Sequence, residues 1–169
     1  MDGAAPMLTK RGFAVLVRFM LALLILAMVA LGLWMLNQVI DSVSILGRSF
    51  VDVPGYPAQV DVWTYHDAAY ALLWTSYAIL VLWEITPWKP GRLTSGRVAI
   101  ALFGFALLTA GLWLSQDLMN AVLILHRQSV DLPFFVASLD LYQARDLAVL
   151  LSTLSFIGFY VLTRIGELD

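Results

Sequence analysis

The chain has 169 residues, of which 61% are hydrophobic and 13% are charged, and its formal net charge is −2. A soluble domain averages about 45–50% apolar and about 25% charged residues, and one core of this size cannot hide so many apolar side chains. The composition therefore excludes a soluble domain, a disordered chain and a basic nucleic-acid-binding protein. The sequence has no cysteine, which excludes disulfides and thiolate metal sites. We expect an integral membrane protein.

Four segments are apolar enough to cross a bilayer, which takes about 20 residues. They run approximately over residues 13–40, 68–83, 98–124 and 147–162. Backbone groups in lipid must be hydrogen-bonded within the segment, so each segment is expected to be helical. The predicted organisation is a cytoplasmic segment at 1–12, a helical hairpin at 13–85, a cytoplasmic loop at 86–97, a second hairpin at 98–165 and a cytoplasmic tail at 166–169.

The basic residues indicate how these segments are oriented. Seven of them fall on one side of the predicted arrangement: Lys10, Arg11, Arg18, Lys89, Arg92, Arg97 and Arg164. The loops on the other side are rich in aspartate. Cytoplasmic loops of membrane proteins carry an excess of Lys and Arg. We therefore expect a multi-pass protein of the inner (plasma) membrane with both termini in the cytoplasm and an acidic outer face.

The second half of the sequence repeats the first half. The tripeptide Gly32-Leu33-Trp34 matches Gly111-Leu112-Trp113, and at this offset 13 of the 36 positions from Gly32 to Asp67 are identical to their counterparts. Self-similarity at a fixed spacing is typical of duplicated units. Each unit would start and end on the inner side, as in parallel repeats. We predict an all-α membrane protein, an up-down-up-down bundle of four transmembrane helices built from two tandem helical hairpins with a parallel pseudo-twofold axis along the membrane normal.

The repeat also predicts details at the helix contacts and helix ends. We call two residues corresponding when the offset that matches Gly32 with Gly111 also matches them. Both glycines lie well inside the first and third helices, where a glycine allows two helices to approach closely. The corresponding residues Asp61 and Asp140 precede the two returning helices and are expected to cap them, with Gln143 completing a capping box with Asp140.

Polar side chains cluster in the outer halves of the first and third spans. The candidate polar site consists of six residues: Asn37, Gln38, Asp41, Gln116, Asp117 and Asn120. In the repeat, Gln38 aligns with Asp117 and Asp41 with Asn120, so each unit keeps one acid and one amide on adjacent turns. A carboxylate near hydrocarbon usually faces a partner or water. Two interpretations are open: a site for a cation, a proton or a polar solute, and hydrogen bonding between helices.

Two short spacings predict ion pairs on the outer face. Arg48 precedes Asp52, and Arg127 precedes Asp131, each by four positions. Capture of an anion by the arginines is one interpretation. The expected one is a local ion pair at the end of each helix, which stabilises little when exposed.

Two histidines remain, His66 and His126, both near the outer ends of helices. Ligation of a haem or of a small metal site by both is geometrically conceivable. The interpretation that we expect is two surface histidines, with no cofactor and no metal.

Two features of the second span complete the candidates. Glu84 is expected to be an interfacial acid near Lys89 and Arg92. Tyr70, Trp74 and Tyr77 share one face of that helix, where packing is expected and a quinone or pigment surface is the alternative.

In length and number of spans the chain resembles the small membrane subunits of tripartite (TRAP-type) carriers. It departs from that family after the first span, where the family's acidic pair and tryptophan are replaced by Asp61-Val62-Trp63. The resemblance covers topology and size and does not extend to sequence motifs.

The sequence contains no phosphate-binding glycine-rich loop and no nucleophile or metalloprotease motif, so we expect no enzyme. The function we expect is that of an accessory or scaffold subunit of a larger inner-membrane complex, such as a transporter, respiratory or photosynthetic assembly. The alternative is a small oligomeric transporter or channel for an ion or polar solute, with its polar site near the outer leaflet. The expected partners are the lipid bilayer and other membrane subunits or further copies of the chain, and no nucleic acid.

Overall fold

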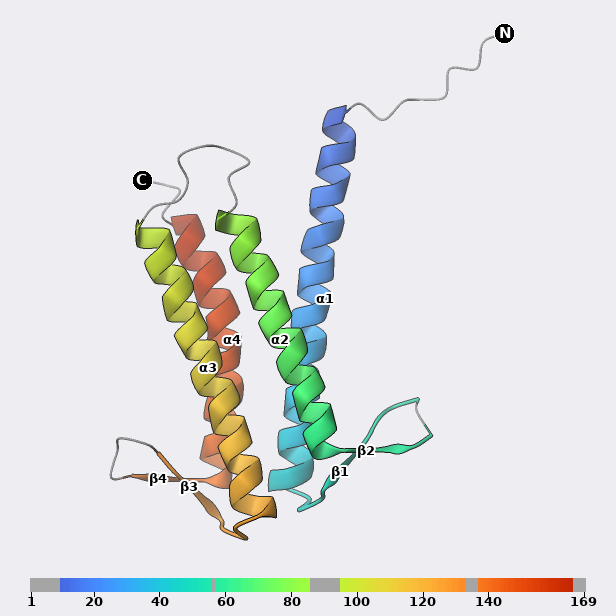
Figure 1. Ribbon diagram of the computed structural model, residues 1–169, viewed down its shortest axis with the longest axis vertical. Helices are drawn as coiled ribbons and strands as arrows, with labels where there is room; N and C mark the ends of the chain where they lie inside the picture. Colours follow the sequence, from blue (N-terminus) through green and yellow to red (C-terminus); the bar gives the residue numbers. More distant parts are fainter. Residues whose placement is uncertain (1–9, 56, 86–94, 133–136, 166–169) are drawn as a thin grey trace.

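The computed structural model describes residues 10–55, 57–85, 95–132 and 137–165 and is mostly helical (Figure 1). In chain order the elements are α1 (Lys10–Ser44), β1 (Phe50–Asp52), β2 (Gln59–Asp61), α2 (Val62–Ile85), α3 (Ser95–Leu123), β3 (Ser129–Asp131), β4 (Ser138–Asp140) and α4 (Leu141–Ile165).

Three of the described helices are long and apolar enough to cross a membrane. They are Val15–Ser44 within α1, Ser95–Leu123, which is all of α3, and Leu141–Arg164 within α4. These helices fit a protein embedded in a membrane, as the composition predicts. Helix α2 is not among them, since it mixes apolar residues with His66, Asp67 and Glu84.

The helices form two antiparallel pairs. Helix α1 packs on α2, and α3 packs on α4, while α1 also contacts both α3 and α4 (Figure 1). The two pairs of short strands lie at the same end of the molecule, where α1 and α3 end and where α2 and α4 begin. We call α1 with α2 the first helical pair, and α3 with α4 the second helical pair.

Each helical pair is joined by a small antiparallel strand pair that the hydropathy pattern did not predict. Phe50 lies opposite Asp61 in the first strand pair, and Ser129 lies opposite Asp140 in the second, so corresponding residues have the same register in the two strand pairs. Such short strands cannot show a clear period of two. The available signal was the Pro54-Gly55 turn, where Gly55 has a φ of 80°.

The predicted caps are confirmed. The Asp61 Oδ1 atom accepts a hydrogen bond from the backbone N–H of Trp63 at 2.9 Å. In the second pair the Asp140 Oδ1 atom accepts from the Gln143 N–H at 2.8 Å, and the Gln143 Oε1 atom accepts from the Asp140 N–H at 3.4 Å. These bonds satisfy amide groups that lack a partner in the first turn of a helix, which fixes where α2 and α4 begin.

The predicted close approach at Gly32 and Gly111 is also confirmed. A Cβ atom on Gly111 would lie 2.8 Å from the carbonyl oxygen of Ala148 and 2.5 Å from Ser152 Oγ on α4. A Cβ atom on Gly32 would lie 2.9 Å from two side-chain atoms of Leu73 on α2. Leu73 and Ser152 are themselves corresponding residues, so the two glycines make corresponding contacts in the two helical pairs.

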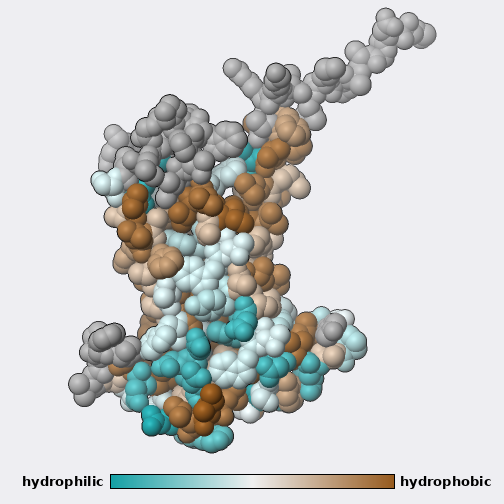
Figure 2. All heavy atoms as spheres, in the orientation of Figure 1, coloured by the Kyte–Doolittle hydropathy of each residue, from teal (hydrophilic) through white to brown (hydrophobic). Residues whose placement is uncertain are grey.

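The core extends along α2, α3 and α4 as far as Phe159 near the end of α4, but on α1 it occupies mainly the half nearest the strands. On α1 its fully buried residues fall on one face: Leu36, Val39, Ile40 and Val43. The other half of α1 differs, because consecutive apolar residues from Val15 to Val17 are exposed, and so are Phe13, Phe19 and Met20. Figure 2 shows hydrophilic residues near the strand end and hydrophobic residues toward the opposite end.

Candidate functional site

Polar side chains join the two helical pairs at the end where the strands lie. The Asp41 carboxylate on α1 is bound on two sides: its Oδ1 atom lies 2.8 Å from Arg145 Nε on α4, and its Oδ2 atom accepts a hydrogen bond from Asn37 Nδ2 at 2.9 Å. Asn37 reaches Asp41 because residues four apart are neighbours on a helix. The side chains of Asp41 and Arg145 are only 31% and 27% exposed. This ion pair is therefore partly shielded from solvent.

Replacing Arg145 tests how much the Asp41–Arg145 ion pair contributes to the stability of the folded protein. We expect Arg145→Ala to lower the free energy of unfolding by about 1–3 kcal/mol, the range for a buried polar group that is left without its partner. The reason is that the Asp41 carboxylate keeps its cost of desolvation and loses its cation. Thermal unfolding in detergent, followed by circular dichroism, measures the change. Arg127→Ala, which removes an exposed pair, is the control; equal losses in the two variants would contradict the expected contribution.

A second polar contact joins α2 to α3. His66 Nε2 and Ser115 Oγ lie 2.9 Å apart, and both residues are buried. The Ser115 hydroxyl already donates its hydrogen to the Leu112 carbonyl at 2.7 Å. Because a hydroxyl has one hydrogen, Ser115 Oγ must accept from His66, which places a hydrogen on Nε2. The Nδ1 atom then faces Asp67 Oδ1 at 3.7 Å.

His66 and Arg145 are corresponding residues near the starts of α2 and α4. Each reaches from its returning helix to the outgoing helix of the other helical pair. The partners differ, since Arg145 meets a carboxylate whereas His66 meets a hydroxyl. The two contacts therefore have a similar geometry. One of them joins two charged groups, whereas the other joins a histidine to an uncharged hydroxyl.

The structure places the six residues of the candidate polar site unequally. Asn37 and Asp41 bond to each other, whereas Gln38, Asp117 and Asn120 are half-buried and Gln116 is exposed. Within the part of the chain that the structure describes, these last four side chains make no hydrogen bond or ion pair. Arg145, which was not a candidate, is the residue that completes the contact. A long-range partner of this kind leaves no local pattern in the sequence.

The two ion pairs that were predicted for the outer face lie at the junctions between helix and strand. Arg48 Nη1 is 3.4 Å from Asp52 Oδ2, and Arg127 Nη1 is 3.1 Å from Asp131 Oδ2. All four side chains are exposed. Exposed ion pairs of this kind typically stabilise a fold by about 0–1 kcal/mol. We therefore expect each pair to contribute little to the stability of the protein.

The expectation of two surface histidines is wrong for His66. His126 is exposed and has a φ of 51°, whereas His66 is buried against α3. The packing of α2 on α3 buries His66, and this long-range contact was not visible in the sequence. Among the described residues, no group of three or more His, Asp or Glu side chains gathers in a way that would hold a metal ion.

At the opposite end of the molecule a third contact joins the helical pairs. Glu84 Oε1 on α2 accepts a hydrogen bond from Arg164 Nη2 on α4 at 2.9 Å. The Glu84 side chain is 5% exposed and that of Arg164 is 45% exposed. The expectation that the Glu84 carboxylate extends toward water is therefore wrong: Glu84 is buried and paired within the molecule. Lys89 and Arg92, named as its neighbours in the sequence, lie outside the described residues.

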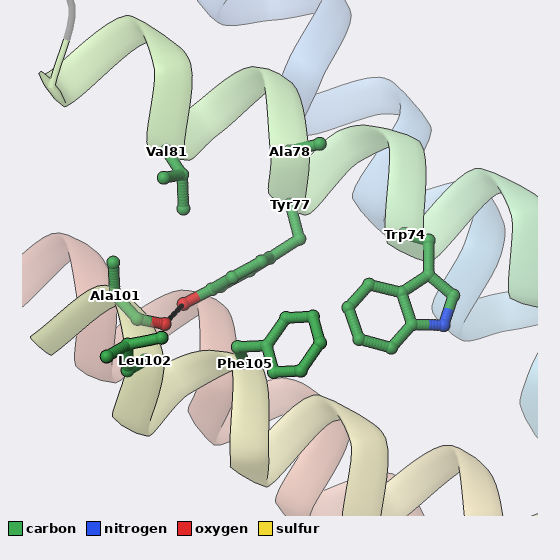
Figure 3. A pocket seen from close by; sticks show the side chains of 7 residues that line it. All are labelled: Trp74, Tyr77, Ala78, Val81, Ala101, Leu102 and Phe105. Atoms are coloured by element: carbon green, nitrogen blue, oxygen red, sulfur yellow. Dashed lines mark hydrogen bonds between the residues drawn. The ribbon is translucent and has the colours of Figure 1, made fainter. Parts of the chain in front are cut away.

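The predicted aromatic face of α2 borders a groove between α2 and α3. Trp74, Tyr77, Ala78 and Val81 line one side, and Ala101, Leu102 and Phe105 line the other (Figure 3). Its volume is about 220 Å³. The Tyr77 hydroxyl crosses the groove and donates to the Ala101 carbonyl at 2.7 Å, and the rings of Trp74 and Phe105 lie 4.7 Å apart.

No family model matches this sequence, and no similar curated protein or solved structure is found.

Proposed function

We propose that this protein is an accessory or scaffold subunit of a larger inner-membrane complex. The observation that supports this most is the exposed half of α1. Val15, Leu16 and Val17 are consecutive and all exposed, and three consecutive helical residues point to widely different directions around the helix. A helix that is apolar all round needs lipid or protein on every side.

The length of α1 adds to this argument. With 35 residues it is about 52 Å long at 1.5 Å per residue, whereas the hydrocarbon core of a bilayer is about 30 Å thick. A neighbouring subunit that covers the exposed residues would offset part of this difference between the length of α1 and the thickness of the hydrocarbon core.

We also propose the finer architecture expected from the sequence: four spans, two tandem hairpins with a parallel pseudo-twofold axis, and both termini in the cytoplasm. Two observations support α2 as the fourth span. Its 24 residues measure about 36 Å, and it lies beside α1 with its first turn at the strand end of the molecule. The shared register of corresponding residues in the two strand pairs supports the repeat.

Affinity purification from native membranes in mild detergent tests the subunit proposal. The tagged full-length chain is expected to retain the same partner membrane proteins at fixed stoichiometry. A matched variant, Val15→Ser combined with Leu16→Ser, is expected to lose them while still inserting in the membrane. A chain that always elutes as a lone monomer would contradict the proposal.

The alternative is a small oligomeric transporter or channel, and the shielded Asp41–Arg145 pair is the observation that favours it. Intramembrane charges often mark paths for ions or protons. Proteoliposomes that contain the protein and a pH-sensitive dye would report proton flux, and potassium-loaded vesicles would report potassium flux. Flux through the unmodified protein that vanishes in Asp41→Asn would favour the transporter or channel over the subunit proposal. Absence of flux through the unmodified protein would contradict the transporter or channel.

A further inference from the structure

His66 is a buried ionisable side chain in the contact between the two helical pairs. Its side chain is 3% exposed, and its Nε2 atom lies 2.9 Å from Ser115 Oγ on α3. The Ser115 hydroxyl gives its only hydrogen to the Leu112 carbonyl oxygen, so the hydrogen of this contact belongs to His66 Nε2. The other ring nitrogen, Nδ1, is therefore the atom at which the imidazole gains or loses its charge.

The groups nearest His66 compensate a proton on Nδ1 only in part. Asp67 Oδ1 lies 3.7 Å from Nδ1, but the Asp67 side chain is 84% exposed, so water weakens its attraction. Tyr70, whose ring centroid is 5.9 Å away, is uncharged at neutral pH. On α3, Asp117 follows Ser115 by two positions, which places it about 200° around the helix from the contact.

The other elements packed against this end of α2 carry three further carboxylates, each with a partner of its own. They are Asp41 on α1, Asp52 on β1 and Asp61 on β2. Arg145 binds the first and Arg48 the second, and the third caps the start of α2. Within the described part of the chain, Asp67 is thus the charged group that acts on the imidazole.

Burial makes the uncharged form of His66 the stable one in the folded protein. The predicted apolar segment of α2 begins at residue 68, so His66 precedes it. Burial lowers the pKa of His66 from its ordinary value of 6.5, and this effect outweighs the opposing effect of Asp67. The unfolded chain therefore takes up this proton more readily than the folded chain. By linkage, stability is full above pH 6.5 and falls as the pH drops below that value.

The corresponding contact of the other helical pair does not share this sensitivity. Arg145 stands where His66 stands in the repeat, and arginine keeps its charge throughout the physiological range. Its guanidinium meets the Asp41 carboxylate at 2.8 Å. On α3 the residue that corresponds to Asp41 is Asn120, whose amide cannot neutralise a cation. Acid therefore charges both contacts, but only one of them contains a matching carboxylate on the opposite helix.

We propose that His66 is a pH-sensitive switch between the helical pairs: a proton taken up at Nδ1 weakens the contact of α2 with α3 and leaves the Asp41–Arg145 contact in place. The charged imidazole then moves toward water and the exposed Asp67 carboxylate. Histidine is the side chain whose ordinary titration range lies nearest to neutral pH, so mild acid at the strand end of the molecule is sufficient. The proposal does not depend on the protein being a complex subunit.

Two spin labels measure how far α2 and α3 separate when the pH changes. Ala71→Cys and Ala110→Cys place them at exposed positions, each five residues from His66 or Ser115, in a chain that has no cysteine. Double electron–electron resonance on the full-length protein in dodecyl maltoside compares pH 7.5 with pH 5.5. We expect longer and more widely distributed distances at pH 5.5, and recovery at pH 7.5. The same distances at both pH values would overturn the proposal.

Substitution of each histidine assigns the response to one residue. His66→Gln in the labelled protein keeps a side-chain N–H for Ser115 but does not titrate, so it is expected to abolish the change of distance. His126→Gln, at the exposed histidine, is the matched control and is expected to keep it. A pH response of the same size in His66→Gln and in the unsubstituted labelled protein would overturn the proposal.

Nuclear magnetic resonance of the unmodified protein, labelled with nitrogen-15 at its two histidines, provides a test that needs no variant. At pH 7.5 we expect His66 to carry its hydrogen on Nε2 and none on Nδ1. Its titration midpoint is expected below the ordinary value of 6.5. A midpoint at or above that value, or a hydrogen on Nδ1 alone at pH 7.5, would overturn the proposal.

Discussion

Replacing Arg164 by leucine is expected to lower the free energy of unfolding by about 3 kcal/mol, the low end of the range for breaking a buried ion pair, because Glu84 is buried but Arg164 is 45% exposed. Glu84 is 5% exposed and accepts a hydrogen bond from Arg164 at 2.9 Å. Without the guanidinium, its carboxylate must stay buried and charged, take up a proton, or pull the end of α2 toward water. Each of these outcomes disfavours the folded state.

A second substitution distinguishes the buried charge from lost packing. Adding Glu84→Leu to Arg164→Leu removes the uncompensated carboxylate and is expected to recover most of the loss, because replacing both partners by apolar groups can be close to neutral. Thermal unfolding of the three proteins in the same detergent measures the effect. A double variant as unstable as Arg164→Leu alone would show that the long side chain of Arg164 acts through packing.

The second large effect is expected at Gly111. Its helix α3 lies so close to α4 that an added methyl group would meet backbone atoms, the carbonyl oxygen of Ala148 at 2.8 Å and the nitrogen of Ser152 at 2.9 Å. Backbone atoms cannot rotate away as a side chain can, so the helices must separate. We expect Gly111→Ala to cost about 1–3 kcal/mol, the usual range for overpacking.

The chain provides two matched controls for this substitution. At Gly32, the corresponding position, the added methyl group would meet only side chains, above all that of Leu73, so a smaller loss is expected. At Gly158 it would meet nothing within 4 Å, and Gly158→Ala is expected to stabilise the helix by about 0.5–1 kcal/mol. Melting temperatures that rank these variants otherwise would contradict the close approach of α3 and α4.

Local chemistry made several features of this fold predictable. Asp61 and Asp140 precede apolar helical segments, and the capping bonds follow from the residue types and the spacing to Gln143. The close approaches at Gly32 and Gly111 followed from the shared tripeptide and the lack of a side chain. These predictions needed information from only a few neighbouring residues.

The partners across the two helical pairs were not predictable in the same way. Because the apolar residues of α1, α2 and α3 are not confined to one face, the sequences of these helices do not indicate which face packs against which helix. Asp41 was a candidate, but its partner Arg145 lies far away in the sequence, in the last helix. His66 and Glu84 looked like surface residues for the same reason, although both are buried. The structure therefore joins two of the candidates, Asn37 and Asp41, to a cation that was not among them.

The most direct test of the proposed architecture uses the absence of cysteine from the chain. Gln59→Cys and Ser138→Cys place single thiols at exposed, corresponding positions in the two strand pairs, and Ser95→Cys places one at the exposed start of α3. With four spans in two parallel hairpins, a membrane-impermeant maleimide should label residues 59 and 138 in cells with an intact inner membrane, and residue 95 only after the membrane is disrupted. Labelling of 59 and 95 without 138 in intact cells would show that α2 does not cross the membrane and would contradict the tandem-hairpin arrangement.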